Sequence, residues 1–298
     1  MGKFVIIDAH SHLWLKQDTI VDGSHIYSME ENPSRSMFFG EERQMLPPFM
    51  IDGRNTAEVF LSNMDYAQVG GAVVVQEVID GNQNDYLREV QEKYPHRFFC
   101  MAMANSKEEA EKAFAEGFRG IAIPGHRLST PLTDLLPMFR YMEEKKMILS
   151  LCLHEDNHQL GEVETIISEC PSLKIAIGHF GMVTTEGWME QIRLARHENV
   201  MVESGGITWL FNSEFYPFPG AIQAIRQAAD EVGMEKLMWG SDYPRTITAI
   251  TYRMSYDFIT KSSAFTEKEK ALFLGENAKA FYGFGELPVL PYIKNMSE

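Results

Sequence analysis

Short apolar runs recur along the chain, and each is followed by a longer amphipathic stretch. Eight such runs end in polar or glycine residues, and they cover residues 4–12, 71–78, 98–105, 118–125, 147–155, 173–181, 200–206 and 236–244. Near-continuous apolar strands are typical of a parallel sheet whose outer face is covered. The pattern therefore predicts eight buried parallel strands.

The stretches between these strands have the periodicity of helices. They cover residues 56–69, 84–94, 106–117, 132–146, 160–170, 186–198 and 220–233. Several begin with a Ser, Thr or Asn capping candidate and two end at glycine, which matches the usual start and stop signals of helices. Eight strands that alternate with helices predict a (β/α)₈ TIM barrel, an α/β fold that commonly fills about 250 residues as one domain.

We therefore interpret residues 1–298 as a single barrel domain with two irregular insertions. The alternative is a doubly wound open sheet, which is disfavoured because no glycine-rich phosphate loop follows the first strand. The long insertion covers residues 16–54 after strand one, and a shorter aromatic one covers residues 207–219 after strand seven. Loops of this length at the C-terminal ends of barrel strands are often lids or binding loops, with a cover for the barrel mouth or a subunit contact as the alternative.

The first strand carries three proton-active side chains in the segment IIDAHSHLW. Asp8, His10 and His12 occupy alternate positions, and successive side chains of a strand point to opposite faces, so we expect all three on one face. Residues two apart are separated by about 6.6 Å, and imidazoles can lean together onto one ion at about 2.0–2.1 Å each. His10 and His12 are candidate metal ligands, and Asp8 is expected to support them. A solvated polar strand face is the alternative.

Three further strands end in residues of the same kind. His154 ends the fifth strand, His179 lies in GHFG at the sixth, and Asp242 lies in GSDYP at the eighth. Catalytic residues of barrels come from the C-terminal ends of the strands, so these residues are expected near His10 and His12. The alternatives are core packing, a histidine bonded to a backbone carbonyl, and a turn. We expect four other histidines not to be ligands: His25, His96, His158 and His197.

Together, these motifs resemble the amidohydrolase superfamily. More narrowly, DAHSH, GHFG and GSDYP are similar to its amidohydrolase-2 branch of metal-dependent hydrolases, lactonases and decarboxylases, such as aminocarboxymuconate semialdehyde decarboxylase. The resemblance implies that one divalent ion, typically zinc with manganese as the alternative, is bound by four residues: His10, His12, His154 and Asp242. It also implies that His179 orients the water or the substrate. A mononuclear site is implied because GIAIPGH, at the fourth strand, offers no Lys or Glu.

The chemistry of such a site suggests a function. A divalent ion lowers the pKa of bound water from 15.7 to about 7 and polarises a carbonyl oxygen. Asp242 is then expected to move protons, and His179 to steady a developing oxyanion. We expect hydrolysis of a small cyclic ester or amide, with a lactone that bears carboxylate or hydroxyl groups favoured. A decarboxylase of an unsaturated or aromatic carboxylic acid is the alternative, and a metal-free binding barrel is the second alternative.

Seven residues near the strand ends are candidates for substrate contacts: Arg127, His126, Arg245, Trp14, Trp209, Glu203 and Tyr243. An arginine can grip a carboxylate through two parallel hydrogen bonds. The aromatic rings are candidates for an apolar or sugar-stacking wall, and Glu203 for a bond to a substrate hydroxyl. Solvated loop charge and ordinary packing are the alternatives.

Charge and composition narrow the class of partner. The formal net charge of −15 argues against nucleic acid and anionic membrane surfaces, which demand clustered Lys and Arg, so we expect a small-molecule substrate. The N-terminal apolar run is too short for a signal peptide or a spanning helix, and the three cysteines lack CxxC spacing. We therefore expect a cytoplasmic protein, for which a homodimer would be ordinary.

Overall fold

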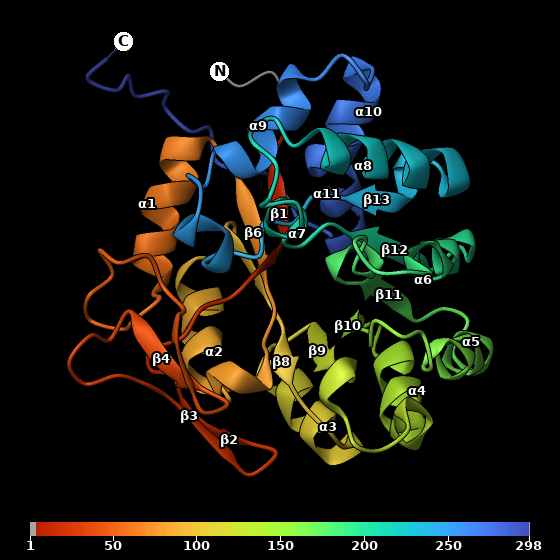
Figure 1. Ribbon diagram of the computed structural model, residues 1–298. Coiled ribbons are helices and arrows are strands. Elements are labelled where there is room, and N and C mark those ends of the chain that lie inside the picture. The colour runs from red at the N-terminus through yellow and green to blue at the C-terminus, as the bar shows by residue number, and fades with distance from the viewer. Residues whose placement is uncertain (1–3, 298) are drawn as a thin grey trace.

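The parallel strands of the protein surround a common axis (Figure 1). The computed structural model describes residues 4–297, so residues 1–3 and 298 of the expected domain lie outside the described residues. The parallel strands are β1 (Ile7–Ser11), β6 (Gly71–Val74), β7 (Phe98–Cys100), β8 (Ala102–Met103), β9 (Gly120–Pro124), β10 (Ile148–Cys152), β11 (Lys174–Ile177), β12 (Val200–Glu203) and β13 (Leu237–Met238). They pair in the orders β1-β6-β7 and β13-β12-β11-β10-β9-β8. Only Met101 separates β7 from β8, so these two form one barrel strand.

The segment that follows β13 closes the barrel against β1. Ala9 N–H donates to the Trp239 carbonyl at 2.9 Å, and Asp242 N–H donates to the His10 carbonyl at 2.9 Å. A parallel bridge between Ser11 and Tyr243 continues this pairing. The predicted (β/α)₈ barrel is confirmed, and the doubly wound alternative is wrong.

The seven predicted helices are all present. They are α1 (Ala57–Ala67), α2 (Asn84–Lys93), α3 (Lys107–Ala115), α4 (Leu136–Glu144), α5 (Leu160–Glu169), α6 (Trp188–Arg193) and α8 (Pro219–Val232). The Ser106 hydroxyl accepts a hydrogen bond from Glu109 N–H at 3.2 Å and so caps the first turn of α3. Four helices were not predicted: α7 (Ile207–Leu210), α9 (Met254–Lys261), α10 (Glu267–Ala271) and α11 (Asn277–Tyr282).

Short helical turns follow several strands and supply residues to the barrel mouth. They are η1 (Val78–Asp80), η2 (Gly125–Arg127), η3 (Leu132–Leu135), η4 (His179–Gly181), η5 (Leu194–Arg196), η6 (Met234–Lys236), η7 (Arg245–Thr248) and the π-helical η8 (Leu272–Glu276).

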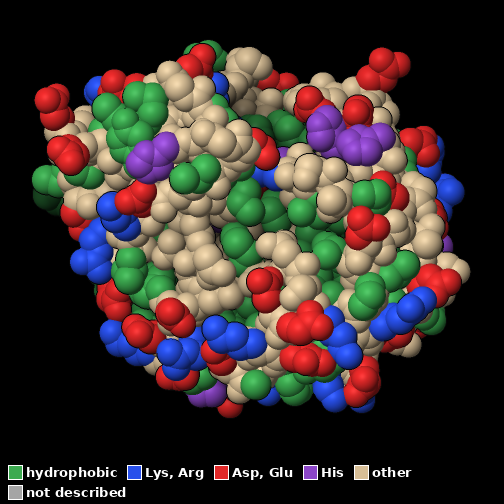
Figure 2. All heavy atoms as spheres, turned by 90° about the horizontal axis from the view of Figure 1, so that it is seen from below, with side chains coloured by type: hydrophobic (Ala, Val, Ile, Leu, Met, Phe, Trp, Pro, Cys, Tyr) green, Lys and Arg blue, Asp and Glu red, His purple; other side chains and the backbone are tan. Residues whose placement is uncertain are grey.

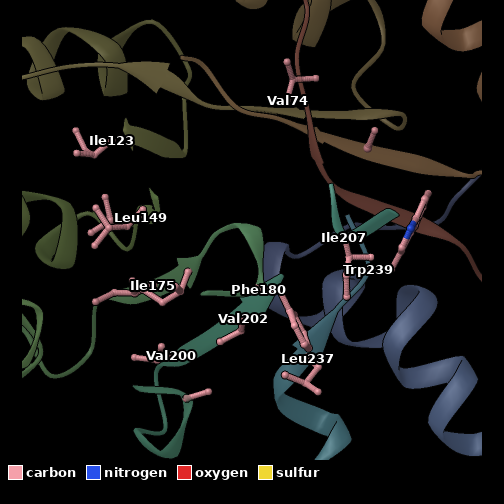
Figure 3. Close-up of a cluster of buried hydrophobic side chains, with 14 of the residues drawn as sticks. Val74, Ile123, Leu149, Ile175, Phe180, Val200, Val202, Ile207, Leu237 and Trp239 are labelled. Atoms are coloured by element: carbon pink, nitrogen blue, oxygen red, sulfur yellow. The ribbon is translucent and has the colours of Figure 1, made fainter. Parts of the chain in front are cut away.

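Two apolar layers stabilise the barrel, one on each face of its strands. Outward-facing residues such as Val74, Leu149 and Val202 pack in a layer with the surrounding helices (Figure 3). Inward-facing residues such as Ala122 and Ala176 form a smaller cluster with side chains of α11. Lys174 at the start of β11 donates to the Phe281 carbonyl at 2.9 Å, so α11 closes the end of the barrel at which the strands begin. The opposite end stays open for a site.

A bulge interrupts β1 between Asp8 and Ser11. Asp8 pairs with Ala72 and Ser11 with Val74, so β1 holds one residue more than β6 over this interval. Asp8, which precedes the bulge, points outward and accepts a hydrogen bond from the Tyr252 hydroxyl at 2.7 Å. The prediction that Asp8 shares a face with His10 and His12 is wrong, because the extra residue reverses the alternation of the strand.

The long insertion folds as a four-stranded antiparallel sheet, which the sequence pattern did not reveal. Its strands are β2 (Asp18–Val21), β3 (Ser24–Ser28), β4 (Arg35–Phe38) and β5 (Glu41–Gln44), paired in chain order. In Figure 1 this sheet lies at the lower left, beside α2. The shorter insertion contains α7.

On the face shown in Figure 2, acidic and basic side chains are interspersed around a hollow that exposes hydrophobic side chains. Within the described residues, no helix has both the length and the apolar character that a membrane crossing requires.

Candidate metal centre

Three predicted ligands converge where β1 meets the segment after β13. The Nε2 atoms of His10 and His12 lie 3.1 Å apart. Asp242 Oδ1 lies 3.2 Å from His12 Nε2 and 3.8 Å from His10 Nε2. The bulge of β1 contributes to this geometry, because it turns His10 into the barrel beside the inward-facing residues Ile7 and Ala9. Two imidazole nitrogens and one carboxylate oxygen therefore face a common point.

Glu203, at the end of β12, orients the His10 ring. Its Oε1 lies 2.7 Å from His10 Nδ1, and the carboxylate is 1% exposed. The proton of the His10 ring is thus drawn to Nδ1, which leaves Nε2 as the atom that faces His12. Burial lowers the pKa of His10, but Glu203 outweighs this effect and raises it to about 9.

Two glycines make room for this pair of side chains. A Cβ atom at Gly240 would lie 2.7 Å from Glu203 Oε2, and one at Gly205 would lie 2.9 Å from His10 Cγ. Both distances are too short for a side chain. The motifs SGG and GSDYP thus contain glycine because the barrel strands approach the His10–Glu203 pair closely.

The donor set fits a divalent cation. Two carboxylates that face the histidines are at most 4% exposed: Glu203 and Asp242. Buried carboxylates are costly unless positive charge compensates them. Burial lowers the pKa of His10, yet the charges of Glu203 and Asp242 raise it overall. Imidazole nitrogen with carboxylate oxygen is a ligand set used for zinc, and manganese accepts carboxylate readily.

His154 does not join the three converging donors. Its side chain lies at the end of β10, is 41% exposed, and places Nδ1 3.0 Å from Asp156 Oδ1. His158 Nδ1 approaches the same oxygen at 2.5 Å, so these three residues form a separate donor group. His154 lines the same cavity as the centre. Its role as fourth ligand stays a prediction.

His179 is held as a neutral imidazole. Burial, followed by the charge of His10, lowers its pKa. Its Nδ1 lies 2.9 Å from the Gly205 carbonyl, which can only accept, so the ring proton sits on Nδ1 and Nε2 is left as an acceptor. This tautomer suits the uptake of a proton. It does not suit the expected role of steadying an oxyanion, which requires a donor.

Asp242 stays ionised and fixed in direction. Burial raises its pKa, but the hydrogen bond from His12 and the charges of the nearby histidines hold the pKa well below its usual range. The Trp209 indole N–H donates to Oδ2 at 2.6 Å, which turns Oδ1 toward His12. Asp242 and His179 both have positive φ values, 58° and 55°, a strained conformation that is often found at functional sites.

The centre opens into a cavity of about 600 Å³ at the mouth of the barrel. Five of the predicted substrate-contact residues line this cavity: Arg127, His126, Arg245, Trp14 and Trp209. Glu203 and Tyr243 do not. Glu203 lies beneath the histidines, whereas Tyr243 is fully buried and stacks on Phe60 with 4.0 Å between ring centroids. Because Asp242 points inward, its neighbour Tyr243 points outward into the helical layer.

Several lining residues escaped the sequence analysis. Four come from the insertion or its end: Phe38, Arg43, Gln44 and Met45. Glu77 and Asp80 follow β6, and the rule applied to the other strand ends could have found them. Glu77 accepts from Arg127 Nε at 3.0 Å. Burial raises the pKa of Glu77, but the hydrogen bond with His126 and the charge of Arg127 lower it to about 2.

Comparisons with known proteins agree with this geometry. The sequence profile of the amidohydrolase family matches residues 7–284. A search of curated protein sequences finds no significant match. Solved structures share the fold at low sequence identity, and three are informative.

An amidohydrolase from Burkholderia multivorans with bound zinc has a TM-score of 0.73 at 17% identity, over 95% of this chain and 100% of that one. A probable 2-pyrone-4,6-dicarboxylic acid hydrolase from Acinetobacter baumannii with citric acid bound has a TM-score of 0.70 at 21% identity, over 94% and 99%. A 5-carboxyvanillate decarboxylase from Novosphingobium aromaticivorans with bound manganese has a TM-score of 0.63 at 17% identity, over 94% and 97%. These likenesses show the fold, and the profile match shows that the chain belongs to the amidohydrolase family of enzymes.

Proposed function

We propose that the protein is a metal-dependent hydrolase of a small cyclic ester that carries a carboxylate. The observation that carries this proposal is the convergence of His10 Nε2, His12 Nε2 and Asp242 Oδ1 within 3.8 Å at the base of a cavity with arginines in its wall. The pyrone hydrolase with the same fold bears a name that describes a reaction of this class, which supports the proposal.

One divalent ion, zinc or alternatively manganese, would be held by His10, His12 and Asp242, with His154 as the proposed fourth ligand. When bound, it would supply the Lewis acidity that polarises an ester carbonyl and acidifies water. Two structures with this fold hold zinc and manganese respectively, which supports both choices of metal.

The side chains of this chain can carry the remaining steps. His179, neutral and with Nε2 as an acceptor, takes the proton of the attacking water. The water oxygen bonds to the acyl carbon, the ring C–O bond breaks, and the leaving oxygen receives the proton back from His179. Arg127 and Arg245 line the cavity and would bind the substrate carboxylate. Trp209 keeps Asp242 in position throughout.

Decarboxylation of an aromatic acid is the second candidate. Three aromatic side chains line the cavity, Trp14, Phe38 and Trp209, and such rings can stack on a flat unsaturated substrate. The carboxyvanillate decarboxylase with the same fold supports this reading. The two candidates share the metal centre and differ in the fate of the carbon skeleton.

The fate of the carbon skeleton separates the two reactions. We expect incubation with a panel of carboxylated lactones in ¹⁸O-labelled water to give an acid that contains one labelled oxygen, with release of a proton that a pH indicator detects. Aromatic carboxylic acids should be left unchanged. Release of carbon dioxide without incorporation of water oxygen would contradict the hydrolase proposal and establish the lyase.

Metal analysis tests the centre independently of any substrate. We expect the purified protein to carry about one divalent ion per chain and His10→Ala to lose it. His197→Ala is the matched control, because His197 pairs with Glu164 on the surface and should not affect metal content. Equal metal content in wild type and His10→Ala would contradict the assignment and favour a metal-free binding barrel.

A further inference from the structure

A buried chain of polar contacts runs from the insertion sheet to His12. The Ser36 hydroxyl on β4 donates to Gln17 Oε1 at 2.5 Å. Gln17 Nε2 donates to Asp80 Oδ1 at 2.9 Å, and Asp80 Oδ2 lies 3.7 Å from His12 Nδ1. Gln17, Ser36 and Asp80 are 0%, 1% and 5% exposed. A buried polar atom without a hydrogen-bond partner is costly, so each of these side chains stabilises the next by supplying that partner.

The chain of polar contacts ends at Nδ1 of His12. His12 Nδ1 is a buried atom without a hydrogen-bond partner. His12 Nε2 is the atom that faces His10 and Asp242, so Nδ1 must carry the ring proton when Nε2 binds a cation. That proton points toward the side of the ring on which Asp80 lies.

The two histidines of β1 thus have comparable surroundings. Glu203 Oε1 lies 2.7 Å from His10 Nδ1, and Asp80 Oδ2 lies 3.7 Å from the corresponding atom of His12. Histidines that bind a metal almost always donate their other ring N–H to a carboxylate, carbonyl or water, which fixes the ring and raises its basicity. Asp80 is the carboxylate available to His12.

Gln17 fixes the orientation of the Asp80 carboxylate. The amide of Gln17 cannot flip freely, because its oxygen accepts from Ser36 while its nitrogen donates to Asp80. Only Oδ1 of Asp80 is engaged by this amide, so Oδ2 remains to accept from His12. The backbone of Gln17 is itself tied to β3, through Ser28 N–H at 3.0 Å.

We propose that Asp80 is the positioning residue of His12, and that the insertion sheet sets its position through Gln17 and Ser36. The inference rests on the metal site of the proposed function but not on the reaction. It gives the insertion a role in metal affinity in addition to its contribution to the cavity wall.

Zinc affinity measured by competition with a chromophoric chelator tests the proposal on the full chain. We expect Asp80→Asn to weaken zinc binding by about 10–100-fold, the usual effect of losing such a partner. Gln17→Met, which keeps the volume but removes both hydrogen bonds, should weaken binding to a smaller extent. Asp80→Glu should restore part of the affinity. Asp85→Asn, an exposed acid on the neighbouring helix, is the matched control and should bind as wild type does.

The absorption spectrum of the cobalt-substituted protein gives a second readout. A change in the ligand field in Asp80→Asn and Gln17→Met, with unchanged circular dichroism, would show that the His12 ring has moved. Wild-type zinc affinity and cobalt spectrum in both variants would overturn the positioning role while leaving the metal centre intact. Failure of the wild type itself to bind zinc would overturn both. If Asp80→Asn does not fold, Gln17→Met alone decides.

Discussion

Asp242→Asn is expected to lower kcat/KM by about 10²–10³-fold, because it removes a proposed ligand of the ion, whose contribution to the transition state is several kcal/mol. Asp242 presents Oδ1 to His12 at 3.2 Å while Oδ2 accepts the Trp209 indole N–H at 2.6 Å. An asparagine that keeps its oxygen on Trp209 must turn its NH₂ group toward the imidazole nitrogens, and an NH₂ group is a donor that cannot bind a cation. Steady-state kinetics on the hydrolysed lactone, together with metal content, measure the effect.

Asp230→Asn is the control for this substitution. Asp230 lies on α8, is 68% exposed and pairs with Arg226 at 3.0 Å, so its loss should leave kcat/KM unchanged. Trp209→Phe should fall between the two, because the carboxylate remains but is no longer held. Wild-type kcat/KM in a folded Asp242→Asn protein would show that this carboxylate takes no part in the reaction.

Glu203→Ala should lower the free energy of unfolding by about 3–5 kcal/mol, the usual cost of removing one partner of a buried ion pair. Glu203 accepts from His10 Nδ1 at 2.7 Å and from His179 N–H at 3.1 Å, and all of these groups lose a partner together. Gly178, Gly205 and Gly240 pack closely around the Glu203 carboxylate and have no side chains, so they cannot fill the space that the substitution would leave. Denaturant unfolding of the metal-free protein measures the change.

The surface pair of Glu164 with His197, at 2.9 Å, provides the matched control. Glu164→Ala also removes a carboxylate from a histidine, but in water, where such pairs contribute little. Its free energy of unfolding should stay close to that of the wild type. A Glu203→Ala variant as stable as Glu164→Ala would mean that His10 does not depend on its buried carboxylate.

The apolar runs were sufficient to predict the barrel and the positions of most site residues. A strand that is apolar on both faces is buried in the barrel, and a polar residue at its C-terminal end lies at the barrel mouth. This is why His10, His12 and Asp242 could be placed there together. The predicted helices followed from the same alternation. The insertion sheet did not, because its strands are short, mostly exposed and mixed in polarity, as β5 shows with four exposed residues.

Local irregularities explain the predictions that failed. The bulge in β1 depends on hydrogen bonds between β1 and β6, so no period in the sequence revealed that Asp8 would turn away from His10. Tyr243 was misplaced for a different reason: it directly follows Asp242, which points inward, so its own ring points outward and stacks on Phe60. Gln17 was missed because its contact with Asp80 crosses from the insertion to the end of β6, which only the folded chain brings together. Asp80 follows β6, so the rule for strand ends could have found it.

The closure of the barrel between β1 and the segment after β13 affects how the protein folds. His10 lies near the start of the chain and Asp242 near its end, and they meet only when the last strand segment docks on the first. Contacts between such distant residues form late, because closing a long loop costs entropy before any contact repays it. The proposed ion would be held by residues from both segments, so it would have no complete binding site in a partly folded barrel. It would slow unfolding and leave the rate of folding unchanged.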